Sequence, residues 1–370
     1  MSSKEIISPR QFSLLLLWFL TGTSILLTPG NLVALSKNSG WICVILLFPF
    51  GMLYLRMLYS LGKIHGNIDF LQINIKVFGK IIGRLITFLV SLFALISAST
   101  VLWVIGDFIA LNILYATPVV YIHILFMLAI LAGVYYGIET IGRTAEIFTP
   151  WILSILLFIA IFSIPQIKWK RTMPFLQEGV QSVLQGSYYE LTISTLPLIT
   201  ILFFFFHSVE KERLSFRNLY VPYFLYVLII TVITFLVITV LGANIGGMHS
   251  FPTYMLSKNI KGAVERVEVL VAISWILTIY FKMNIYFFAA CKGIANTLSL
   301  QSYRSIVLPV GIITLCLSVI IYPDNIYADN WNQSIWLYYV TTFGLLYPIL
   351  LWVISVIKHK RASSGNQKTP

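Results

Sequence analysis

Ten long apolar runs constrain this chain more than any other feature of its sequence. Each has about 18 residues or more, the length that a helix needs to cross the hydrocarbon core of a bilayer. Only 10% of the residues are charged and 58% are apolar, too few charges for the surface of a soluble protein. We therefore predict an all-α polytopic membrane protein with ten transmembrane helices. They lie at about 12–35, 41–61, 83–111, 118–136, 145–164, 189–206, 219–243, 267–291, 305–322 and 334–357.

The lysines and arginines predict the orientation of these spans. Ten crossings place both termini on one side, and cytoplasmic segments carry an excess of lysine and arginine. With a cytoplasmic amino terminus, most of these cations fall in inner segments. We therefore predict cytoplasmic termini and a basic tail over 358–370 near anionic lipid of the bilayer. The net charge of +12 follows mainly from this topology and does not indicate nucleic-acid binding.

Two halves of five spans would enter the membrane from opposite sides, because five is odd. We predict a single membrane domain over 1–370, with a first five-helix repeat over 12–164 and a second, inverted repeat over 189–357. Inverted repeats of this kind place broken helices at corresponding positions, here spans one and six, and bind solutes near mid-membrane.

Spans one and six both contain residues that interrupt a membrane helix. Span one contains Thr21 to Gly30, a cluster of glycine, hydroxyls and proline that lipid-facing helices avoid. Span six contains Pro197, which removes a backbone donor in mid-segment. Helix ends exposed at such breaks can hold an ion or a charged solute. The alternatives are a packing face of small residues in span one and a simple proline kink in span six.

Lys282 is the clearest ionisable residue inside a span, since it lies near the middle of span eight. Such residues are costly and usually functional. Lys282 could be a fixed cation in the place of a sodium ion or the partner of a ligand carboxylate. Alternatively, it could snorkel or pair with a neighbouring span. Glu190 opens span six; it could have a function of this kind or could simply reach the membrane interface. Ser97 and Thr100 share a face of span three; they could line a site or bond to their own backbone.

Motifs for catalysis and metal binding are absent from the sequence. The five histidines are scattered without metal-ligand spacing, and there is no nucleophile elbow, phosphate loop or catalytic carboxylate pair. Cys43, Cys291 and Cys316 lie in apolar runs and are interpreted as core residues. We expect no catalytic residue, metal or cofactor. A membrane enzyme such as an acyltransferase is disfavoured, because no intramembrane histidine pairs with a nucleophile or acid.

Short motifs occur in a characteristic order and spacing along nearly the whole chain. They are Ile7 to Gln11, Gly22 to Pro29, Trp41, Ser215 to Arg217, Glu265 to Glu268 and Tyr322 to Asp324. With the ten-span plan, they resemble the B subunit of spore germinant receptors, which is the spore permease family of the amino acid–polyamine–organocation superfamily.

This resemblance implies a LeuT-like five-plus-five fold in the inner membrane of a dormant spore. It also implies A and lipoprotein C partner subunits, and a role in sensing a nutrient such as an amino acid to trigger germination. Residues and resemblance together give a set of candidate ligand-binding residues. They are Gly22, Thr23, Ser24, Ile25, Ser97, Thr100, Thr195, Leu196, Pro197, Leu198, Thr278, Phe281 and Lys282.

The alternative function is an amino acid transporter of the same fold, coupled to a proton or sodium gradient. Such a transporter is expected to carry a proton-relay carboxylate near the site, and none is clear in the sequence.

Overall fold

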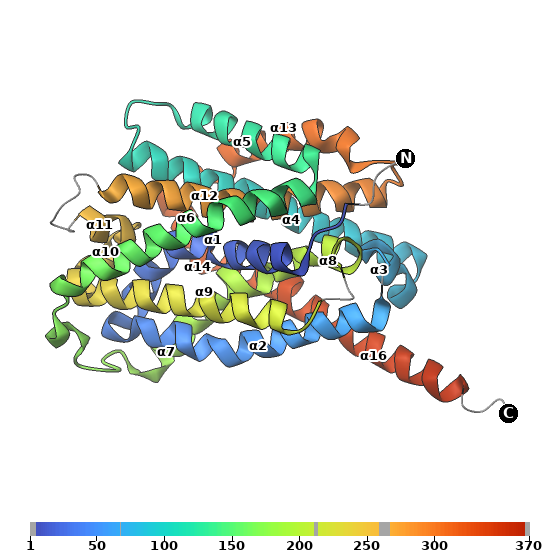
Figure 1. Ribbon diagram of the computed structural model, residues 1–370, viewed down its shortest axis with the longest axis horizontal. Coiled ribbons are helices and arrows are strands. Elements are labelled where there is room, and N and C mark those ends of the chain that lie inside the picture. Colours follow the sequence, from blue (N-terminus) through green and yellow to red (C-terminus); the bar gives the residue numbers. More distant parts are fainter. Residues whose placement is uncertain (1–4, 67, 211–213, 259–266, 367–370) are drawn as a thin grey trace.

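The computed structural model describes residues 5–66, 68–210, 214–258 and 267–366, which form a bundle of helices (Figure 1). Within these ranges there is no β-strand, although Ile7 and Val209 form an isolated parallel bridge. The first half contains α1 (Pro9–Ser36), α2 (Gly40–His65), α3 (Phe70–Phe78), α4 (Lys80–Asn112), α5 (Val119–Tyr136) and α6 (Ile138–Ser163). The second half contains α7 (Gly179–Glu190), α8 (Leu202–Ser208), α9 (Arg217–Leu236), α10 (Ala243–Met248), α11 (Pro252–Lys258), α12 (Val267–Thr297), α13 (Val307–Ile320), α14 (Asn325–Gln333), α15 (Ile335–Thr341) and α16 (Tyr347–Asn366).

Nine helical stretches of the described residues are long and apolar enough to cross a membrane, so the chain is a multi-pass membrane protein. The first stretch, Pro9–His65, contains both α1 and α2, which the 3-10 turn η1 (Lys37–Ser39) separates. Its 57 residues would measure about 85 Å as one helix, against a hydrocarbon core of about 30 Å. The stretch therefore has the length of two crossings, while the total of ten spans stays a prediction.

The centre of the bundle is formed by α1, α4, α12 and span six. In the most apolar window of each span, 89% of the residues are buried in Gly179–Phe205 and only 22% in Ile138–Gln166. The first of these spans is therefore enclosed by protein, whereas the second leaves most of its apolar surface for lipid. Helix α12 packs against both α1 and α4 along the same core. Polar side chains on these central helices can therefore meet one another.

Helix α1 is one uninterrupted α-helix with Pro29 inside it. The break predicted at Thr21 to Gly30 is therefore not seen. The Thr21 hydroxyl bonds to the Leu17 carbonyl at 2.8 Å within the same helix. A Cβ atom added to Gly22 would lie 2.7 Å from Cβ of Lys282. In this structure the small residues serve close helix packing, which is the alternative interpretation of this stretch.

Span six, in contrast, departs from α-helical geometry near its middle. After α7 the chain forms a π-helix, η4 (Leu191–Thr195), then a 3-10 helix, η5 (Leu196–Ile201), before α8 begins. Pro197 occupies an early position of the 3-10 helix, where a missing backbone donor is tolerated. Irregular helical turns of this kind are frequent at functional sites. Their backbone hydrogen bonds join residues at a different spacing from that of an α-helix, which can leave carbonyl groups available to other partners.

Both termini lie at the same end of the bundle (Figure 1). The predicted tail at 358–370 is partly helical, because α16 continues to Asn366. The boundaries of the two repeats, 12–164 and 189–357, stay predictions.

The amino-terminal segment fastens several loops at this end of the bundle. The Glu5 carboxylate accepts hydrogen bonds from Arg304 Nη2 at 2.5 Å and from the Tyr303 hydroxyl at 2.8 Å. Two residues further on, the Ile7 amide donates to the Ser208 carbonyl at 2.7 Å. The segment thus joins the end of span six to the loop before α13.

We expect Glu5→Gln to destabilise the protein by about 1.5–3 kcal/mol, the usual contribution of a hydrogen bond to a charged group. The midpoint of thermal unfolding in detergent would fall by a few degrees. Glu139→Gln is the matched control, because Glu139 pairs with Arg143 at 2.6 Å on an exposed helix face, where such pairs contribute about 0.3–0.5 kcal/mol. Equal midpoints for the two variants would contradict the proposed fastening.

Candidate ligand-binding site

Lys282 is buried in the centre of the bundle, with only 1% of its surface exposed. Its Nζ atom donates hydrogen bonds to Thr23 Oγ1 at 2.7 Å and to the Ile193 carbonyl at 2.9 Å. It also lies 5.6 Å from the centre of the Phe19 ring. The ammonium thus joins α12 to α1 and to the π-helical turn of span six. The interpretation of Lys282 as a snorkelling lysine is wrong, because its head does not reach the interface.

No carboxylate of the described residues lies within 4.0 Å of the Lys282 ammonium. Its positive charge is instead held by a hydroxyl and a carbonyl, both of which are neutral acceptors. An ammonium in such surroundings retains the ability to attract an anion.

Glu190 is the second buried charged residue of the core, and it is 0% exposed. Its Oε2 atom accepts a hydrogen bond from Thr28 Oγ1 at 2.5 Å, and its Oε1 atom accepts one from the Tyr226 hydroxyl. The alternative that Glu190 simply reaches the membrane interface is therefore wrong.

A small cavity lies beside Lys282, between α1, α4, α12 and α15. Four of the predicted site residues line it, namely Thr23, Ser97, Thr100 and Lys282. The remaining wall is formed by Leu27, Val101, Val104, Ile193, Tyr286, Asn332 and Trp336. The cavity measures about 30 Å³, which is room for about one water molecule. An amino acid could enter it only if the surrounding helices or side chains move.

The other predicted site residues are buried close by but do not line this cavity. Gly22 packs against the stem of Lys282. The hydroxyl of Ser24 is buried without a hydrogen-bond partner, whereas that of Thr195 lies 3.4 Å from the Tyr223 hydroxyl. The residues that the structure places outside the cavity wall are Gly22, Ser24, Ile25, Thr195, Leu196, Pro197, Leu198, Thr278 and Phe281.

Seven of the residues that line the cavity were not predicted as site residues, and neither was Glu190. Glu190 had a signal, since it is a carboxylate in an apolar segment, but its depth in the bundle was not predicted. Asn332 reaches the cavity from the end of α14, and Trp336 reaches it from α15. Nothing in their local sequence indicates a site, because a polar residue next to a span is normally interfacial.

The described residues contain no group of three or more histidine, cysteine, aspartate or glutamate side chains placed to hold a metal ion.

Two solved structures share the arrangement of helices of this chain. Mhp1, a nucleobase-cation-symport-1 family transporter in a closed conformation with bromovinylhydantoin bound, aligns with a TM-score of 0.67 and 11% identity, covering 98% of this chain and 93% of that chain. MhsT in complex with L-phenylalanine aligns with a TM-score of 0.67 and 13% identity, covering 96% and 99%. The predicted fold class is confirmed: this is an all-helical membrane protein with the LeuT fold.

Sequence comparison then gives the family. The family described as "Spore germination protein" matches residues 6–326. Spore germination protein KB of Bacillus subtilis (strain 168) is 22% identical over 365 residues, covering 97% of this chain and 96% of that protein. Spore germination protein A2 of the same strain is 24% identical over 353 residues, covering 92% of each. The chain belongs to the family of spore germination proteins.

Proposed function

We propose that this chain is the nutrient-sensing membrane subunit of a spore germination receptor, and that its ligand is an amino acid. It would lie in the spore inner membrane with both termini cytoplasmic and act with A and C subunits. Family membership and the transporter fold support a small-molecule ligand. The choice of an amino acid rests on the site itself, because a buried ammonium suits a ligand carboxylate.

Lys282 is the single observation that carries this proposal. The backbone N–H groups of α1 near Gly22 are used within an uninterrupted helix, so they are not free to bind a carboxylate. The Lys282 ammonium is a charged donor beside the cavity, and its two protein acceptors are both neutral. A ligand carboxylate would therefore lie against Lys282, with the rest of the ligand towards Ser97, Thr100 and Tyr286.

The size of the cavity supports sensing by a change of conformation. At about 30 Å³ the site is too small for an amino acid, so ligand would bind only a conformation in which the site is wider. A ligand that binds one conformation better than the other shifts their populations by its differential affinity. Partner subunits could then detect the change at the surface of the bundle.

Binding of radiolabelled amino acids to the purified receptor complex tests this site. Gly22→Ala adds one methyl group 2.7 Å from Lys282 Cβ and 2.8 Å from its Cδ, so we expect it to displace the lysine and weaken binding at least tenfold. Gly30→Ala is the matched control on the same helix, because its added methyl group would meet the His249 carbonyl at 2.9 Å and not the cavity. Equal affinities in two folded variants would show that the site is elsewhere.

Glu190 favours a second candidate function, a proton-coupled amino acid transporter. Such a transporter is expected to have a carboxylate near its site, and Glu190 is a buried carboxylate of the same core. Uptake into proteoliposomes separates the two functions. We expect binding without net accumulation of solute. Accumulation that follows a proton gradient and disappears in Glu190→Gln would favour the transporter.

A further inference from the structure

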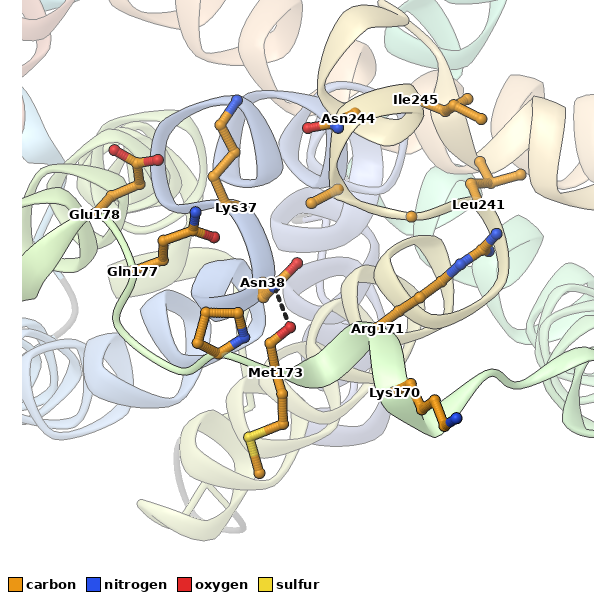
Figure 2. A pocket seen from close by; sticks show the side chains of 13 residues that line it. Lys37, Asn38, Lys170, Arg171, Met173, Gln177, Glu178, Leu241, Asn244 and Ile245 are labelled. Atoms are coloured by element: carbon orange, nitrogen blue, oxygen red, sulfur yellow. Dashed lines mark hydrogen bonds between the residues drawn. The ribbon is translucent and has the colours of Figure 1, made fainter.

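A second, larger pocket opens at the end of the bundle that is opposite the termini, where α7 and α10 lie (Figure 1). It measures about 600 Å³, within the usual range for sites that hold small molecules. Figure 2 shows its walls, which come from three stretches that are distant in sequence: 37–38, 170–178 and 241–245. These are the turn after α1, the loop before α7 and the connection from α9 into α10, which contribute Lys37, Asn38, Lys170, Arg171, Met173, Pro174, Gln177, Glu178, Leu241, Gly242, Ala243, Asn244 and Ile245.

Hydrogen bonds between these segments hold the pocket in shape. Asn38 Nδ2 donates to the Met173 carbonyl at 2.9 Å (Figure 2). The Leu176 amide donates to Ser39 Oγ at 2.8 Å, which fastens the loop to the turn after α1 a second time. On the other side, the Lys168 amide donates to the Thr239 carbonyl at 3.2 Å. The pocket is therefore a cross-linked part of the fold and not a gap between independent loops.

Three cations face this pocket against one carboxylate. Lys37 and Arg171 are half-buried and Lys170 is exposed, while Glu178 is the acidic residue of the wall. Throughout the described part of the chain, no carboxylate lies within 4.0 Å of any of these three cations. Cations gathered in a concave wall raise the local concentration of anions, because the low-dielectric protein focuses their field.

Arg171 has the geometry of an anion-binding residue. Its Nη1 atom donates to the Val240 carbonyl and, at 3.5 Å, to the Thr239 carbonyl. These bonds fix the guanidinium plane and leave its Nε and Nη2 donors available. A fixed guanidinium presents parallel donors that match the two oxygens of a carboxylate or phosphate.

We propose that this pocket is a second binding site, distinct from the cavity beside Lys282, and that its ligand is a small oxyanion such as a carboxylate or phosphate group. Arg171 would bind the oxyanion directly, and Lys37 and Lys170 would supply the remaining positive charge. The amide side chains of Gln177 and Asn244 add uncharged donors at the rim.

Calorimetric titration of the full-length protein in phosphatidylcholine nanodiscs tests this proposal, with inorganic phosphate and succinate as probes at constant ionic strength. We expect saturable binding that weakens at least tenfold in the Lys37→Gln/Lys170→Gln double variant. The side chains of these two lysines make no hydrogen bond to the described residues, so the double variant is expected to fold. Lys168→Gln is the matched control, because Lys168 is exposed on the same loop but does not line the pocket. We expect its affinity to stay within about twofold of wild type.

The oxyanion could also be the phosphate of a lipid headgroup. Nanodiscs containing phosphatidylglycerol distinguish this source: a lipid-bound site would raise the unfolding temperature of the wild type and not of the double variant, without binding of soluble phosphate. The proposal is overturned if neither the soluble probes nor the anionic lipid bind, or if the double variant and Lys168→Gln behave alike. The test is independent of the central site, because Gly22→Ala is expected to keep its affinity for phosphate.

Discussion

Lys282→Met is expected to weaken amino acid binding about 10- to 100-fold while leaving the protein folded. Methionine fills a similar volume, and it removes the cost of burying an ammonium that has no carboxylate of the described residues within 4.0 Å. The ligand, however, would lose a charge-assisted hydrogen bond of about 1.5–3 kcal/mol, which corresponds to an affinity loss of about 10- to 100-fold. If Lys282 had only a structural role, the Lys282→Met variant would not lose affinity for the ligand while keeping its stability.

Equilibrium binding of radiolabelled amino acid and thermal unfolding, measured on the same preparation, check this expectation. Lys292→Met is the matched control, because Lys292 lies ten residues further along the same helix, bonds to His207 and does not line the cavity. We expect the control to bind normally. Unchanged affinity in a folded Lys282→Met protein would show that Lys282 is not part of the ligand site.

Glu190→Gln is expected to destabilise the core by about 1.5–3 kcal/mol. Glutamine keeps one acceptor oxygen, so one of the two hydroxyl bonds, from Thr28 or from Tyr226, loses its acceptor. The destabilisation would lower the midpoint of thermal unfolding.

Glu178→Gln is the matched control for this second prediction. Glu178 precedes the same helix but is exposed and makes no capping hydrogen bond, so its replacement should change stability by less than about 0.5 kcal/mol. If Glu190→Gln were as stable as wild type, the hydrogen bonds from Thr28 and Tyr226 to Glu190 would not contribute to the stability of the core.

The sequence predicted the membrane class and the fold family of this protein but only part of its site. Thr23, Ser97, Thr100 and Lys282 were predicted, and they do line one cavity. They could be found because a hydroxyl or an ammonium inside an apolar run is conspicuous. The depth of Glu190 in the bundle was not predicted, because it depends on how α1 and α9 pack over the end of α7, and no local sequence pattern indicates that packing.

The two interrupted spans illustrate the same limit. Glycine and proline predicted departures from helical geometry in both, yet α1 is continuous and only span six contains π and 3-10 turns. Such residues permit a break, but neighbouring helices decide whether one forms. In α1 the space left by Gly22 is filled by the stem of Lys282, which stabilises a straight helix instead.

The sequence by itself determined that this chain crosses the membrane many times as helices. Lipid offers no hydrogen-bond partners to backbone groups, so membrane spans must be helical, and the length of each apolar run can be read from the sequence. It also marked Lys282 as exceptional, since an isolated charge in hydrocarbon is costly. Only the tertiary structure decided what meets that charge. Thr23 lies 259 residues from Lys282 along the chain and Ile193 lies 89 away, and contacts over such distances follow from helix packing and not from local sequence.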